Sequence, residues 1–105
     1  MATRATYEFV QGFLDQHIYI FNRLDGYPKG AAEHLKNATT AESFLRKNER
    51  SEITSSHCIH GDTEYRYVIN SKNKTIIVYE REYPEGYCDH WNEIFDDTFE
   101  AFLKE

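Results

Sequence analysis

One stretch in the second half of this 105-residue chain constrains the fold more than any other. Tyr65, Tyr67 and Ile69 recur at every second position, which places them on one face of a strand. A polar turn follows over residues 71–74, and residues 75–81 are again rich in isoleucine and valine. The pattern predicts two strands joined by a short turn.

Two further strands are predicted near the N-terminus, over residues 6–10 and 16–22. Tyr7 and Phe9 share one face of the first strand, while the second is β-branched and aromatic at its centre and apolar on both faces. The five residues between the two strands suit a hairpin loop. These strands are therefore expected to pair antiparallel.

Two short helices are predicted to follow this hairpin. The first runs from Pro28 to Lys36, because proline suits the first helical position, where its missing N–H is not needed. A capping box formed by Thr39 and Glu42 starts the second helix, which is expected to end near Glu49.

An apolar stripe at spacings of three and four predicts a final helix near the C-terminus, capped by Asp89. The stripe consists of Trp91, Ile94, Phe95, Phe99, Phe102 and Leu103. Acidic residues occupy the other side of this predicted helix: Glu93, Asp96, Asp97 and Glu100.

With an optional strand within residues 51–59, the elements follow the order ββαα(β)ββα. Two hairpins joined by helices favour an α+β fold, with helices on one face of a mostly antiparallel sheet of four to five strands. A chain of this length is expected to form a single domain over residues 1–105. Since the edges of such a sheet often pair with a second copy, a homodimer is one expected arrangement.

The charge of the chain is concentrated near its C-terminus. The net charge is −6, of which residues 80–105 carry −7 and the remaining residues +1. No basic face is present in the sequence, which disfavours direct binding to nucleic acid.

No apolar run approaches the roughly 20 residues that cross a bilayer, so no membrane span is expected. The N-terminus lacks an apolar signal core, so a cytoplasmic location is expected.

Tyrosines next to the acidic segment suggest a contact surface. Tyr83 and Tyr87 precede the predicted helix, and tyrosine is enriched in the cores of protein interfaces. Together with the four acids of that helix, they predict a surface that binds a basic protein partner. The alternative is that tyrosines fill a core while their hydroxyl groups reach solvent.

Two Cys-x-His pairs form a candidate metal site, with no other cofactor indicated. In an extended segment residues two apart face the same way, so Cys58 with His60 and Cys88 with His90 would offer two thiolates and two imidazoles to zinc. The spacing is not one of the usual zinc patterns, and the two pairs lie far apart in sequence. The alternative is a chance scatter of histidines and cysteines, with both thiols free in a reducing compartment.

A loop before the first predicted helix is a second candidate site. It contains Asp25, Gly26, Tyr27 and Lys29, and Lys29 with the free amides of the helix start could receive an anion. The alternative is an ordinary strand-to-helix turn. A pocket between sheet and helices, lined by tyrosines and Trp91, is a further place for a small ligand.

Three segments resemble small orphan proteins carried by phages and by integron gene cassettes: Ala2–Tyr7, Asp25–Ala32 and His60–Tyr67. The resemblance spans most of the chain. It implies a bacterial accessory protein of a mobile element, and it assigns no catalytic residue. Many such proteins bind a host or phage protein, so by analogy an interaction role is expected.

The first hypothesis is therefore a non-catalytic protein that presents an acidic, tyrosine-rich surface to a protein partner. The second is a small metal-binding domain or metal-dependent enzyme centred on the two Cys-x-His pairs. A small-ligand pocket is the third.

Overall fold

A computed structural model describes residues 4–11, 16–22, 26–36, 38, 40–48, 51–54, 63–81 and 91–104. Within these residues the chain forms six strands and three helices. In chain order they are β1 (Ala5–Gln11), β2 (Gln16–Asn22), α1 (Pro28–Leu35), α2 (Ala41–Lys47), β3 (Glu52–Thr54), β4 (Tyr65–Asn70), β5 (Thr75–Arg81), β6 (Trp91–Thr98) and α3 (Phe99–Leu103).

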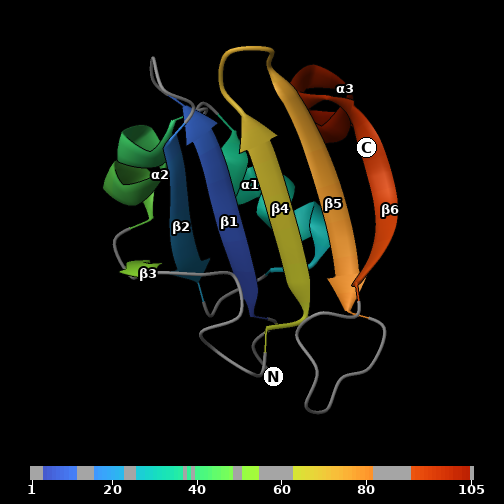
Figure 1. The fold of residues 1–105 in the computed structure, drawn as a ribbon, viewed down its shortest axis with the longest axis horizontal. Coiled ribbons are helices and arrows are strands. Elements are labelled where there is room, and N and C mark those ends of the chain that lie inside the picture. The colour runs from blue at the N-terminus through green and yellow to red at the C-terminus, as the bar shows by residue number, and fades with distance from the viewer. Residues whose placement is uncertain are drawn as a thin grey trace.

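The strands form one mixed sheet in the order β3-β2-β1-β4-β5-β6 (Figure 1). β1 and β4 run parallel, and the other four pairings of the described strands are antiparallel. The predicted α+β class is confirmed, but the sheet has six strands rather than four or five. The β1–β4 pair is parallel because the chain crosses through α1, α2 and β3 before β4 enters beside β1.

The two predicted hairpins and the first predicted helix are present. β1 pairs antiparallel with β2 along its whole length, and β4 pairs in the same way with β5. In the turn between β4 and β5, Asn70 Oδ1 accepts hydrogen bonds from the N–H groups of Lys72 at 3.1 Å and Asn73 at 3.0 Å. Because one side chain satisfies two turn amides, a short polar segment is enough to reverse the chain. α1 begins at Pro28, as predicted.

α2 is capped one residue later than predicted. The cap is Thr40 rather than Thr39: the Thr40 hydroxyl accepts from the Ser43 N–H at 3.3 Å, and the Ser43 hydroxyl accepts from the Thr40 N–H at 3.1 Å. Glu42 therefore falls outside the capping box. Its carboxylate instead accepts hydrogen bonds from the Gln11 amide at 3.1 and 3.2 Å, which ties the start of α2 to the end of β1.

The predicted C-terminal helix is wrong over most of its length. Residues 91–98 form strand β6 against β5, and only the five residues of α3 are helical. The cap of α3 is Thr98, whose hydroxyl accepts from the Ala101 N–H at 3.1 Å, whereas the predicted cap, Asp89, lies outside the described residues. Asparagine, aspartate and threonine are poor helix formers, and the edge of β5 offers this segment a backbone partner.

A β-bulge explains why this strand resembles a helix in sequence. Val78 faces Phe95 and Tyr79 faces Glu93, so Ile94 is an extra residue between two paired positions of β6. The extra residue interrupts the alternation of faces at every second position. Apolar residues then recur at spacings of three and four along a strand, as they would on a helix.

The three helices lie on one face of the sheet, behind it in Figure 1. We call this the covered face and the opposite one the open face. In the core under the helices, the Tyr7 ring stacks on Tyr67 at 5.0 Å between centroids and packs against Phe44 at 4.5 Å. The buried Tyr67 hydroxyl donates a 2.5 Å hydrogen bond to the Gly26 carbonyl, which fixes the segment that leads into α1.

Candidate functional site

The four predicted acidic residues lie on β6 and α3, and all four are exposed. Because β6 is a strand, they do not share one helix face. Glu93 and Asp96 lie opposite Tyr79 and Ile77 of β5, which place them on the open face. Asp97 and Glu100 lie further along, at the end of β6 and in the first turn of α3. The four acids therefore lie along the β6 edge of the sheet and in the helix that follows it. Tyr83 and Tyr87 lie outside the described residues.

β6 is an edge strand of eight residues. It pairs with β5 on one side, and within the described part of the chain no strand pairs with its other side. The opposite edge of the sheet is β3, which has three residues. A long edge strand offers a row of backbone donors and acceptors to another extended segment. β6 is thus the longer of the two edges of the sheet.

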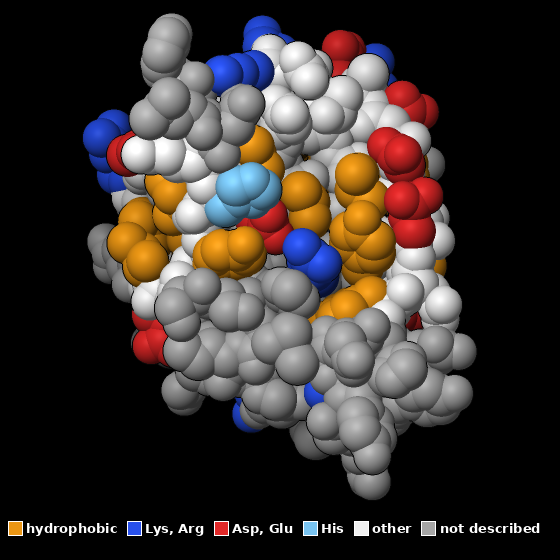
Figure 2. Space-filling model, in the orientation of Figure 1, with side chains coloured by type: hydrophobic (Ala, Val, Ile, Leu, Met, Phe, Trp, Pro, Cys, Tyr) orange, Lys and Arg blue, Asp and Glu red, His pale blue; other side chains and the backbone are white. Residues whose placement is uncertain are grey.

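Within the described residues, salt bridges compensate only part of the acidic charge along this edge. Among the described residues, Glu93 and Asp96 have no salt-bridge partner. Lys104, at the end of α3, pairs with Glu100 at 3.2 Å. In Figure 2 acidic side chains line the margin of the open face on the side of β6. This margin attracts cations and repels other acidic segments.

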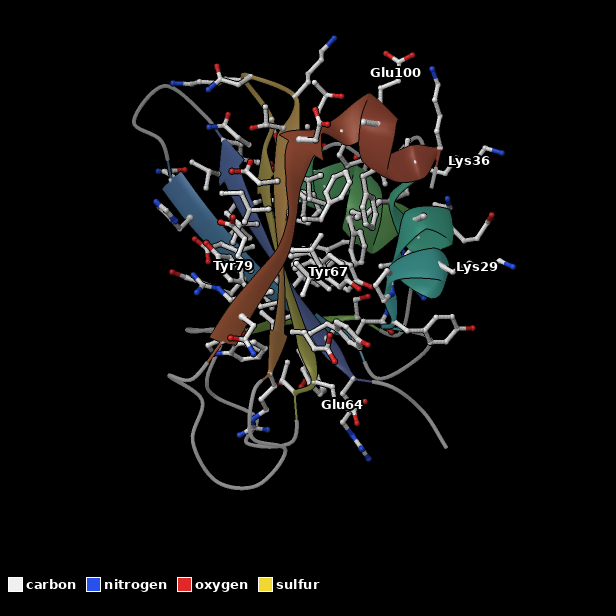
Figure 3. The ribbon with its side chains drawn as sticks, turned by 90° about the vertical axis from the view of Figure 1, so that its right-hand side faces the viewer. Lys29, Lys36, Glu64, Tyr67, Tyr79 and Glu100 are labelled. Atoms are coloured by element: carbon white, nitrogen blue, oxygen red, sulfur yellow. The ribbon has the colours of Figure 1, made fainter. Side chains whose placement is uncertain are left out.

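A pocket of about 300 Å³ lies beside β6, between the sheet and the helices. It is lined by Pro28, Lys29, Val78, Ile94, Phe95 and Phe102. The lining is thus apolar except for Lys29, which points away from the sheet in Figure 3. Ile94 forms its outer rim and is 46% exposed. The sequence predicted a pocket lined by tyrosines and Trp91; this one is lined by neither.

The predicted anion loop lies next to this pocket. The Gly26 carbonyl is held by Tyr67, and Tyr27 precedes α1 in an extended conformation without a side-chain cap. Lys29 is exposed on the first turn of the helix, and Asp25 lies outside the described residues. The loop therefore contributes one wall of the pocket through Pro28 and Lys29.

The open face carries a polar cluster that the sequence did not reveal. Glu8, which is 3% exposed, accepts a hydrogen bond from Arg66 at 2.8 Å and lies 2.5 Å from His17 Nδ1. Burial raises the pKa of Glu8, but the hydrogen bonds from Arg66 and His17 lower it more, so the pKa lies below its usual value. The Arg66 guanidinium also lies over the Tyr79 ring, 5.2 Å from its centroid. In Figure 2 hydrophobic side chains surround this polar centre.

Glu8 compensates the charge of Arg66 and hydrogen-bonds to His17, so we assign this cluster to the architecture of the sheet. It joins β1, β2 and β4 on the open face. The alternation of Tyr7 and Phe9 did place Glu8 on the opposite face. Its partners are 9 and 58 positions away in sequence, however, and only the strand order brings them together.

The predicted zinc ligands Cys58, His60, Cys88 and His90 lie outside the described residues. Within the part that the structure describes, no three histidine, cysteine or acidic side chains gather closely enough to hold a metal ion.

No described helix is both long enough and apolar enough to cross a bilayer. No protein-family model, curated protein or solved structure matches this chain.

Proposed function

We propose that this protein is a non-catalytic interaction module that binds a basic, extended segment of a partner protein along β6. The observation that carries the proposal is an eight-residue edge strand whose exposed acids have no salt-bridge partner among the described residues. Backbone hydrogen bonds to this edge would supply affinity, and the acids would select basic side chains. The resemblance to accessory proteins of phages and integron cassettes favours an interaction role by analogy.

A second copy of the chain is the alternative occupant of this edge. Pairing two copies of β6 would bring their acidic side chains close together, and like charges at neighbouring cross-strand positions are destabilising. The charges that disfavour a homodimer favour a basic strand. We therefore assign the edge to a different protein.

The proposal is tested with a synthetic peptide of about nine residues in which lysine and threonine alternate. Binding is measured by fluorescence anisotropy at low and at high salt. We expect the wild-type protein to bind, with an affinity that falls as salt screens the charges. The double variant Glu93→Lys/Asp96→Lys should lose binding while keeping its circular dichroism spectrum.

Glu52→Lys is the control, because it reverses an exposed acid on β3, at the opposite edge of the same sheet. It should leave peptide binding nearly unchanged. A loss for each reversed charge that is as large in the β3 variant as in the β6 variant would show that only the overall charge matters, and the proposal would then fail.

A further inference from the structure

We infer that the pocket beside β6 takes one large apolar side chain of the bound segment, so that the partner carries a basic–apolar–basic sequence. This inference rests on the proposed function, because it requires a strand to be added at the edge of β6. It adds a binding site and a recognition rule that the charges of β6 alone do not specify.

The bulge in β6 places the pocket where an added strand can reach it. Ile94 is the extra residue of the bulge, and it lies at the rim of a pocket that Phe95 also lines. These two neighbours therefore both contribute to the covered side, on the outermost strand of the described sheet. Figure 3 faces this edge and shows α1 on the covered side of the sheet.

The geometry of a strand then fixes the sequence pattern of the ligand. Side chains of an extended segment point alternately to the two faces of the sheet. A side chain that enters the pocket at the level of Ile94 has both of its neighbours on the open face. There they lie beside Glu93 and Asp96, which flank the bulge on that face. An apolar residue between two basic residues matches this arrangement.

The chemistry of the lining selects the central side chain. Val78 and Phe102 form the buried part of the pocket and are 1% and 3% exposed. The side chain of Lys29 points away from the sheet (Figure 3), so a polar group in the pocket would lose water without gaining a partner from it. A volume of about 300 Å³ accommodates a side chain as large as leucine or phenylalanine.

The test compares three peptides of about nine residues on the wild-type protein. All have threonine at the remaining positions. The first has alternating lysines and a central leucine; the second has serine in place of leucine; the third keeps leucine but has threonine in place of every lysine. Trp91, the single tryptophan of the chain, lies on β6 and provides a fluorescence signal alongside anisotropy.

Two protein variants complete the design. Ile94→Ser removes the apolar rim of the pocket, and Ile53→Ser makes the same change at a 65% exposed position of β3, on the other edge. Because Ile94 is itself 46% exposed, its replacement should leave the fold intact. Circular dichroism and the thermal midpoint check this for each variant.

We expect wild-type protein to bind the leucine–lysine peptide roughly tenfold to a hundredfold more tightly than the serine–lysine peptide, as burial of one large apolar side chain implies. Most of this difference should disappear in Ile94→Ser and persist in Ile53→Ser. The peptide without lysines should bind weakly.

The remaining outcomes separate the two proposals. Equal binding of the leucine and serine peptides would overturn the apolar anchor and leave the proposed function standing. No binding of either lysine peptide to folded protein would refute the proposed function and the anchor with it. Equal binding with and without lysines would make the pocket a site for apolar ligands in general. A stable dimer that the peptides do not dissociate would show that a second copy of the chain binds the β6 edge, and it would refute the proposed function.

Discussion

Tyr7 and Glu8 are neighbours in β1, yet the first faces the helices and the second faces the open side of the sheet. Tyr7 packs among aromatic rings, with Phe44 at 4.5 Å and Tyr67 at 5.0 Å. Glu8 is buried to a similar degree, but Arg66 and His17 hold its charge. Apolar burial stabilises through contact area from many neighbours, whereas a buried charge depends on each of its partners. The two faces should therefore respond to different perturbations.

The largest effect is expected on the covered face. Phe44 is fully buried and packs its ring on Tyr7 and Phe9. Phe44→Ala should lower the free energy of unfolding by about 3–5 kcal/mol, because it removes apolar contact and leaves a cavity. Urea denaturation followed by circular dichroism measures this loss. A loss below about 1 kcal/mol would mean that the aromatic cluster is not the centre of the core.

On the open face, Glu8→Gln keeps the size of the side chain and removes its charge. Arg66 then lacks a compensating anion, and we expect a loss of about 2 kcal/mol in the free energy of unfolding. Adding Arg66→Met should recover part of the loss, because the uncompensated cation is removed as well. If the double variant is no more stable than the sum of the single changes predicts, the charges do not act as a pair.

The same cluster predicts a loss of stability at acid pH. The pKa of Glu8 is lowered from its usual 4.5, so the unfolded chain binds a proton at a higher pH than the folded chain. The stability due to Glu8 is therefore fully present above that usual pKa and is lost as the pH falls through the folded pKa. From about pH 5 to pH 3, the wild-type protein should lose more stability than Glu8→Gln. Parallel pH profiles of the two proteins would contradict this.

A smaller effect is expected where the core meets the helix layer. Tyr67→Phe keeps the ring and removes the hydroxyl that donates to the Gly26 carbonyl at 2.5 Å. We expect a loss of about 1–2 kcal/mol, because a buried carbonyl loses its donor. The variant should also expose the amides at the start of α1 to faster hydrogen exchange. Unchanged exchange there would show that Tyr67 does not hold this segment.

Local patterns in the sequence were enough to predict the parts of the fold that form between neighbouring segments. The alternation of Tyr65, Tyr67 and Ile69 identified a buried strand face, and Pro28 identified a helix start. The parallel pairing of β1 with β4 was missed, because no local pattern specifies which distant strands meet. The prediction was wrong for residues 91–98, where the bulge at Ile94 produces a helix-like spacing within a strand.

The candidate site shows the same limit. The sequence identified the acidic segment but predicted an acidic helix face. The structure places Glu93 and Asp96 on an edge strand instead. The pocket joins residues of α1, β5, β6 and α3, which only the tertiary structure brings together. The buried Glu8 resembled an ordinary exposed residue of an alternating strand until its partners were known.

The smallest expected effect concerns the ring beneath Arg66. The guanidinium lies 5.2 Å from the centroid of Tyr79, and the Arg66 side chain is 22% exposed. Replacing the ring with leucine (Tyr79→Leu) keeps apolar contact but removes the cation–π attraction, so we expect a loss of about 0.5–1 kcal/mol. A double-mutant cycle with Arg66→Met isolates the cation–π contribution. In the Arg66→Met background, Tyr79→Leu should lower the free energy of unfolding by less than it does in the wild-type protein. If the cost is the same with and without Arg66, the ring stabilises the open face by apolar contact alone, and the contrast between the faces rests on Glu8.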